Sequence, residues 1–262
     1  MKLLKDIFKS FKLYKNYIFC LMKVELNMRK RETFFGIFWK IILSLIVIIF
    51  MSMIFDKGFF KGSNYIVYLS ANYFLWVFIN DTLGDSPKLF ESYNNILQNN
   101  NIIPLVYIYK NILMNFYIYS YSFIILICLL IYKSLININL IFSFLSIIII
   151  FINIYLISII TSHLQGKFSD IDSINRLMLL IAFFFTPIIY SEDILPAKSQ
   201  FILQLNPFYH FFKIYNTPLL NLEITKEYYT SWIVSISFTF ICFLIANIFY
   251  KKFNNQISNL FK

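Results

Sequence analysis

The sequence predicts an all-α integral membrane protein with six transmembrane helices. Hydrophobic residues make up 59% of the 262 residues, whereas a soluble domain has about 45–50%. Charged residues make up 14%, against about 25% in a soluble domain. A chain of this composition cannot cover itself with polar surface, so a soluble globular fold is not expected. The net charge of +10, together with 32 Phe and 19 Tyr, favours a bilayer over nucleic acid as a partner.

A basic segment, residues 1–34, begins the chain. It holds nine Lys and Arg residues, and no small-residue cleavage site follows it, so a signal peptide is not expected. Apolar residues recur in it every three or four positions with lysines on the opposite face: Leu4, Phe8, Phe11, Tyr14, Ile18 and Leu21. This pattern predicts an amphipathic helix in the membrane interface, its cations facing anionic lipid headgroups. A solvated basic helix is the alternative.

Six apolar runs then form a transmembrane domain over residues 35–250. Each run is close to or above the length of about 17–25 residues that crosses the hydrocarbon of a bilayer. The runs cover residues 35–55, 65–83, 105–132, 140–161, 174–190 and 229–250. Helices are expected because lipid offers the backbone no hydrogen-bond partner. An even number of spans places both termini on one side of the membrane.

Positive charge identifies that side. Sixteen of the 23 Lys and Arg residues lie in the basic segment, in the connections after the second and fourth spans, and in the tail, residues 251–262. Six lie on the opposite side. The positive-inside rule therefore predicts that both termini are cytoplasmic.

Two connections are longer than a simple link requires. In the cytoplasmic one, residues 85–104, Ser86 followed by Pro87 predicts the start of a short helix that the Asn-rich stretch 99–101 ends. Such an exposed helix is suited to binding a soluble partner, although it can equally be a surface helix of no special role. The external connection, residues 191–226, holds two apolar stretches bounded by prolines, residues 194–205 and 208–220. They are too short to cross the membrane and predict re-entrant or interfacial helices.

Nucleotide, metal and disulfide chemistry have no sequence signature. The five glycines form neither a Walker A loop nor a dinucleotide fingerprint, so any ATP that the chain uses is expected to be hydrolysed by a partner. Cys20, Cys128 and Cys242 lie far apart and are expected to be buried free thiols. His163 and His210 pair with no cysteine. We therefore expect no cofactor and no metal in this chain.

Several motifs, in this order, carry a resemblance to a known family. They are Arg31-Glu32-Thr33 with Gly36-Ile37-Phe38-Trp39, Asn95-Ile96-Leu97 through Ile103-Pro104-Leu105, Lys167-Phe168-Ser169-Asp170-Ile171, Thr186-Pro187-Ile188-Ile189-Tyr190, and Asn206-Pro207-Phe208-Tyr209-His210 through Pro218-Leu219-Leu220. From about residue 25 onward the chain resembles the membrane subunit of ABC transporters of the type-2 permease family, in the polysaccharide and O-antigen export branch. It departs from that family at Lys167, Ser169 and Asn216, where arginine is usual.

The resemblance implies a homodimer in the bacterial cytoplasmic (inner) membrane, bound to two copies of a separate ATPase that carries ATP and Mg. The chain would then be a transport subunit and not an enzyme, and its substrate a lipid-linked glycan. The two external stretches would form a gate, and the cytoplasmic helix would couple to the ATPase. The implied residues are Pro87, Lys88, Glu91, Tyr93 and Asn99 for coupling, Pro187, Asn206, Pro207 and Pro218 for the gate, and Arg31, Trp39, Lys167 and Asp170 for the cytoplasmic entrance.

A path for a glycan needs aromatic rings for the flat C–H faces of sugars and few fixed charges. The outer half of the spans offers such residues: Tyr65, Tyr68, Tyr73, Trp76 and Tyr190. Each one taken singly is equally an interfacial belt residue. The spans hold no ionisable residue deep inside, which argues against a carrier driven by protons or sodium ions.

Other functions remain open at this point. A teichoic-acid or small hydrophobic-drug exporter would belong to the same superfamily. An integral membrane enzyme acting on lipid-linked sugars would use His163, Asp170 and Asp172, although Gly166 suggests that the helix of His163 ends before Asp170. A purely structural membrane anchor would leave the external stretches unexplained.

Overall fold

The computed structural model describes residues 2–32, 35–55, 64–99 and 102–253, and all regular structure in these ranges is helical. The elements, in chain order, are α1 (Lys2–Glu32), α2 (Phe38–Phe55), α3 (Tyr65–Asp85), α4 (Leu89–Ser92), α5 (Asn94–Asn99), α6 (Leu105–Tyr132), α7 (Leu140–Gln165), α8 (Ile171–Phe184), the 3-10 turn η1 (Glu192–Ile194), α9 (Ala197–Gln204), α10 (Pro207–Leu219) and α11 (Lys226–Phe253). The all-helical prediction is confirmed for the described residues. Most of the predicted tail, 251–262, lies outside them.

Four of the described helices, α2, α6, α7 and α11, are long and apolar enough to cross a membrane. The predicted run 65–83 forms the helix α3, which is not among these four. The predicted run 174–190 is helical only as far as Phe184. The 14 residues of α8 span about 21 Å at 1.5 Å per residue, less than the hydrocarbon of a bilayer. The helix ends just before Thr186-Pro187, because a proline disfavours helical geometry in the residue that precedes it.

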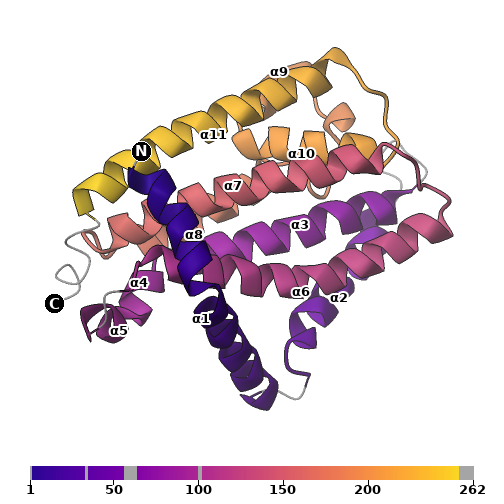
Figure 1. Cartoon of the computed structure of the whole chain (residues 1–262). Coiled ribbons are helices and arrows are strands. Elements are labelled where there is room, and N and C mark those ends of the chain that lie inside the picture. Colours follow the sequence, from indigo (N-terminus) through magenta and orange to yellow (C-terminus); the bar gives the residue numbers. More distant parts are fainter. Residues whose placement is uncertain (1, 33–34, 56–63, 100–101, 254–262) are drawn as a thin grey trace.

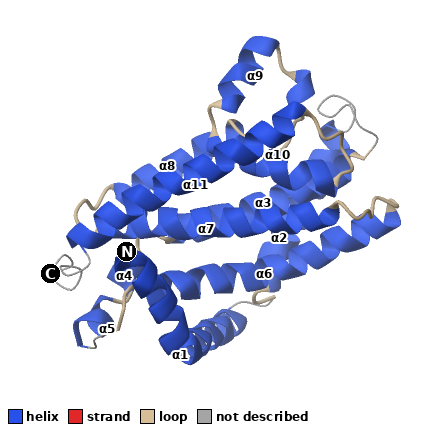
Figure 2. Cartoon of the chain, turned by 45° about the horizontal axis from the view of Figure 1, so that its top comes forward, coloured by secondary structure: helices blue, strands red, loops and turns tan. Residues whose placement is uncertain are grey.

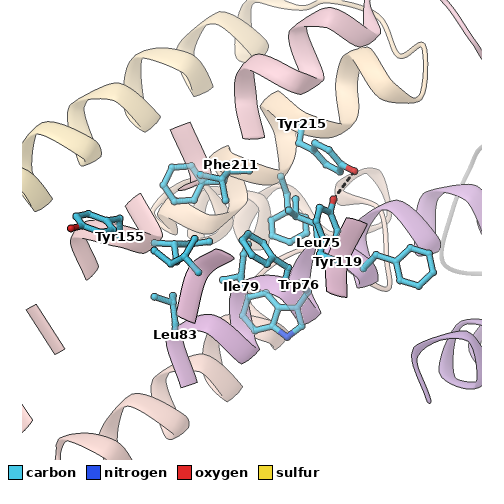
Figure 3. Packing of buried hydrophobic residues seen from close by; sticks show 14 of the residues in the cluster. Leu75, Trp76, Ile79, Leu83, Tyr119, Tyr155, Phe211 and Tyr215 are labelled. Carbon is cyan, nitrogen blue, oxygen red and sulfur yellow. Dashed lines mark hydrogen bonds between the residues drawn. The ribbon is translucent and has the colours of Figure 1, made fainter. Parts of the chain in front are cut away.

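The central helix is α3, which contacts α2, α6, α7, α8 and α10 (Figure 1). Its side chains Leu75, Ile79 and Leu83 are buried in the middle of the bundle, as Figure 3 shows. Above them, the hydroxyls of Tyr119 on α6 and Tyr215 on α10 lie 3.3 Å apart. Lipid tails are as apolar as leucine, so tight packing and hydrogen bonds of this kind, rather than the hydrophobic effect, hold membrane helices together.

The helix α1 crosses the outside of the bundle, packing on α6 and touching α11 (Figure 1). Its predicted apolar residues separate into two groups. Ile18 is fully buried and Leu21 packs against the core, whereas Leu4, Phe8 and Phe11 remain exposed. A hydrogen bond from Tyr250 Oη to Asp6 Oδ2, 2.8 Å long, ties α1 to the end of α11. The first turns of α1, the short helices α4 and α5, and the last turns of α11 lie at one end of the bundle, with α9 at the other (Figures 1 and 2).

The predicted cytoplasmic helix is two short helices, α4 and α5, interrupted at Tyr93. Ser86 does not cap the first of them, contrary to the prediction. Its hydroxyl donates to Leu83 O at 2.8 Å and lies 2.7 Å from the Thr161 hydroxyl, and its carbonyl accepts from Ser162 Oγ at 2.6 Å. Ser86 is thus used to anchor the end of α3 to α7.

The prediction that all three cysteines are buried is wrong for two of them. Cys242 is buried, but Cys20 and Cys128 are exposed on the outer faces of α1 and α6. In a helix that faces lipid, an apolar run does not distinguish the face that packs against protein from the face that packs against lipid.

Candidate functional site

A cleft of about 440 Å³ lies between α3 and α8 and combines aromatic with charged side chains. Residues three or four apart share one face of a helix, and the lining residues follow that spacing on both helices. They include Tyr73, Trp76, Asn80, Asp81 and Asp85 of α3 and Arg176, Leu179 and Phe183 of α8. The volume lies in the range of about 300–1,000 Å³ that is typical of ligand sites.

The outer end of the cleft is aromatic. The Trp76 ring lies 5.7 Å from the Phe183 ring, 6.0 Å from Phe208 and 6.4 Å from Phe212, measured between ring centres. Two of these partners, Phe208 and Phe212, belong to α10, so the same indole forms a wall of the cleft and packs against α10. Figure 3 shows Trp76 at the edge of the buried core. Such an arrangement offers a flat apolar surface beside polar groups.

The inner end of the cleft is charged. Asp81 accepts from Lys40 Nζ of α2 at 2.5 Å, and Asp85 follows one turn later. Arg176 faces them from α8. Neither Lys40 nor Asp81 was among the site residues expected from the sequence, although opposite charges at the inner ends of successive spans are a signal that points to such a pair.

Asp172 connects this cleft with the segment between α3 and α6 that holds α4 and α5. One carboxylate oxygen lies 2.9 Å from Lys88 Nζ and the other 3.2 Å from Arg176 Nε, and the side chain is only 11% exposed. Burial raises the pKa of this carboxyl, but the hydrogen bonds and charges of the two cations lower it further, so the net pKa is below the usual value. The ion pairs therefore persist above the unfolded pKa of about 3.9 and are lost only as the pH falls through the lower folded value.

The expected coupling residues occupy different environments. Pro87 is buried, Lys88 forms the ion pair with Asp172, and Glu91 is exposed. The Tyr93 ring stacks on the Tyr107 ring of α6 with centres 4.2 Å apart. Asn99 ends α5, and its side chain lies outside the described part of the chain.

Of the five expected path aromatics, the structure places Tyr73 and Trp76 in the cleft and the others near the segment that follows α8. Tyr65 donates to Ile189 O at 2.8 Å. The Tyr68 hydroxyl lies 2.6 Å from Pro187 O and 2.7 Å from Tyr190 O. These buried tyrosines thus hold the segment 187–190 in place.

Three of the four expected gate residues belong to α10 or its cap, whereas Pro187 lies in the segment that follows α8. Asn206 caps it, accepting from Phe208 N at 3.0 Å and donating to Thr186 Oγ1 at 2.9 Å, with Pro207 in the first turn. Pro218 is buried in its last turn. The cap therefore links the start of α10 to the end of α8.

An ion cluster around Lys213 joins η1, α10 and α11. Lys213 Nζ lies 2.9 Å from Glu192 of η1 and 2.5 Å from Glu227 of α11, and its side chain is 10% exposed. The Tyr209 hydroxyl lies 3.0 Å from the same ammonium. The sequence pattern did not single out this lysine. A lone cation in an apolar stretch is nevertheless a signal, because a buried charge requires a partner.

We expect Lys213→Met to destabilise the packing of η1, α10 and α11, because it leaves the Glu192 and Glu227 carboxylates without a cation between them. Since both carboxylates are partly exposed, the expected loss of unfolding free energy is about 1–3 kcal/mol. Hydrogen exchange of η1 and α10 should increase in the purified variant. The matched control is Lys198→Met, at an exposed lysine of α9. Equal exchange in the two variants would contradict the structural role of Lys213.

The four expected entrance residues do not form one site. Arg31 is exposed at the end of α1, and the Trp39 ring stacks on Phe35 at 5.7 Å. Lys167 lies over the Phe168 ring, 5.0 Å from its centre, and Asp170 is exposed. Within the described ranges, no hydrogen bond, ion pair or ring contact connects the first two residues with the last two.

The residues of the enzyme alternative are also apart. The His163 ring packs against Phe90 and Tyr250, with centres 5.1 and 5.8 Å away, and its Nδ1 lies 2.6 Å from Ile159 O. Because α7 ends at Gln165, His163 and Asp170 do not share a helix. Among the described residues, no group of three His, Cys, Asp or Glu side chains is placed to hold a metal ion.

Comparison with known proteins identifies no relative: no protein-family model matches the chain, and no curated protein matches it.

Proposed function

We propose that this chain is the membrane-spanning permease subunit of an ATP-driven exporter that moves a lipid-linked polysaccharide across the bacterial cytoplasmic membrane. The observation that carries the proposal is the cleft between α3 and α8, whose inner end Asp172 joins, through its ion pairs with Arg176 and Lys88, to the connection that we propose is cytoplasmic. Aromatic rings at Tyr73 and Trp76 suit the C–H faces of a sugar, and the polar groups beside them suit its hydroxyls.

The proposed membrane layout has six spans and both termini in the cytoplasm. In it, α3 and α8 complete the set begun by α2, α6, α7 and α11, and α8 continues through the segment 187–190. The two short helices α9 and α10 form the external gate. The supporting observation is that the first turns of the basic α1, the α4–α5 connection and the last turns of α11 lie at one end of the bundle (Figure 1).

The proposed assembly is a homodimer with two copies of a separate ATPase. The outer face of α8 exposes Leu177, Met178 and Leu180 next to the cleft, and an apolar surface of this kind favours a protein partner or lipid. A second copy placed there would close the cleft into a channel. The exposed Glu91, in the α4–α5 connection, would contact the ATPase, which would supply the nucleotide site that the chain lacks.

Depletion of the chain in its own cell should cause radiolabelled lipid-linked glycan to accumulate inside. Complementation with Tyr73→Ala should restore export about two- to twelve-fold less well than wild type, because one aromatic contact contributes about 0.5–1.5 kcal/mol. The control is Tyr132→Ala, an exposed tyrosine at the end of α6. Accumulation of teichoic acid or of a hydrophobic drug instead would favour the alternative exporters. Unchanged glycan export after depletion would refute the proposal.

A further inference from the structure

A second and larger hollow, of about 700 Å³, lies between α1, α6, α7 and α11, away from the cleft. Its lining is almost entirely apolar and comes from four helices. It includes Phe8 and Phe11 of α1, Leu113 of α6, Ile152 of α7 and Phe240 of α11. We name it the α1 groove. Its volume is sufficient for a ligand of moderate size, and its lack of polar groups fits a hydrocarbon ligand.

The α1 groove is open toward the outside of the bundle. Phe8 is 73% exposed and Phe240 is 61% exposed, although both line it. Further residues on α7 and α11 are also large, apolar and exposed: Ile148 beside the groove and Ile236 in its lining. These faces are the surfaces that meet hydrocarbon when α7 and α11 lie in a bilayer, so a lipid chain can enter the groove from the side.

Two lysines of α1 each lie one helical turn after a phenylalanine that lines the α1 groove. Lys12 and Lys15 follow Phe8 and Phe11 by four residues, and residues four apart share a helix face. Both lysines are exposed, and neither has an ion-pair partner within the described residues. An apolar groove with two unpaired cations one helical turn beyond its lining phenylalanines matches a molecule that has a hydrocarbon chain and a negative head.

We infer that the α1 groove binds one acyl chain of an anionic phospholipid, whose phosphate lies between Lys12 and Lys15. A second copy of this chain is a poorer occupant, because it would bring a net charge of +10 and its own lysine-rich helix to the same place. The site requires only that the chain lies in a bilayer, so it is independent of the proposed glycan export.

The test is native mass spectrometry of the purified full chain. Delipidated protein is incubated with equal amounts of palmitoyl-oleoyl phosphatidylglycerol and of the phosphatidylcholine with the same chains. One phosphatidylglycerol should be retained with a preference of about 30-fold over phosphatidylcholine, since each lysine near an anionic lipid contributes about five-fold. Lys12→Gln combined with Lys15→Gln should remove the preference. Lys23→Gln combined with Lys30→Gln, which changes the net charge equally on the same helix, should preserve it.

A second pair of variants tests the groove itself. Leu113→Trp fills it and should abolish retention of phosphatidylglycerol, whereas Ile124→Trp, at an exposed position of the same helix, should not. The Phe8 side chain is exposed, so Phe8→Ala should not impair folding. The substitution removes one apolar wall of the groove and should weaken retention of phosphatidylglycerol about ten-fold.

Three results would overturn the inference. One is equal retention of the two lipids by wild-type protein. Another is retention that neither Leu113→Trp nor Phe8→Ala reduces. The third is a lipid-free dimer that Leu113→Trp converts to monomer, which would make the groove an interface between two copies.

Discussion

Glu25→Gln is expected to lower the free energy of unfolding by about 3–5 kcal/mol, the usual cost of removing one partner from a buried ion pair. Lys110 of α6 is 3% exposed, and its ammonium forms an ion pair with Glu25 of α1. No other carboxylate pairs with it in the described part of the chain. The ammonium also lies over the Tyr93 ring, 5.4 Å from its centre. The neutral variant would leave the lysine charged and buried, and so would detach α1 from α6.

Chemical denaturation of the purified chain in detergent measures this loss. Glu25→Gln with Lys110→Met should recover most of the stability, because an apolar side chain of similar length replaces the stranded charge. Glu91→Gln, at an exposed acid, is the control. Equal stability of Glu25→Gln and wild type would show that the pair does not hold α1.

Acid should have the same effect as this substitution. Burial raises the pKa of Glu25, but the hydrogen bonds and charges of Lys110 and Arg29 lower it further, so the net pKa is depressed. A carboxyl with a depressed folded pKa stabilises the fold above its unfolded value of about 4.3 and loses this contribution as the pH falls through the folded value.

Lys88→Glu should produce the largest functional effect, a loss of export of at least about ten-fold while the protein stays folded. The reversal places a second carboxylate beside the buried Asp172, and like charges in close contact cost several kcal/mol. The start of α8 must then shift, and with it Arg176 in the cleft. Each 1.4 kcal/mol lost from a transport step would reduce its rate about ten-fold.

The measurements are the rate of ATP-dependent export and the amount of ATPase that purifies with the tagged chain. Lys88→Glu should impair export even where the ATPase remains bound, and Lys88→Glu with Asp172→Lys should restore part of it. Glu91→Lys should instead weaken ATPase binding, because that side chain points outward. Lys251→Glu, an exposed reversal at the end of α11, should change neither. Unimpaired export by Lys88→Glu would remove Asp172 from the proposed coupling route.

Local patterns predicted the helices but not all of their limits. The length of each apolar run is readable in the sequence, since each helix satisfies its own backbone. The end of α8 has a local cause in Pro187, whereas the path of the chain after α8 and the break at Tyr93 depend on contacts with other helices. Tyr65 and Tyr68, more than a hundred residues earlier, hold the segment after α8, and Tyr107 stacks on Tyr93.

The candidate site shows the same division. Tyr73 and Trp76 were expected as path residues from their aromatic rings and their place in the spans, and the structure puts both in the lining of the cleft. Asp81 is paired with Lys40, 41 residues earlier in the chain. Asp172 is paired with Lys88, about 80 residues earlier. No spacing rule within a helix connects residues so distant.

The sequence by itself determined that this chain is helical, apolar and basic at one end, because these properties follow from composition and from period along a single helix. The tertiary structure alone decided which polar side chains meet. Glu25 meets Lys110, Asp172 meets Lys88, and Lys213 joins two glutamates, each across different elements. The physical reason is that pairing between helices depends on their rotation and crossing, and in an apolar environment each buried charge selects the helix arrangement that supplies its partner.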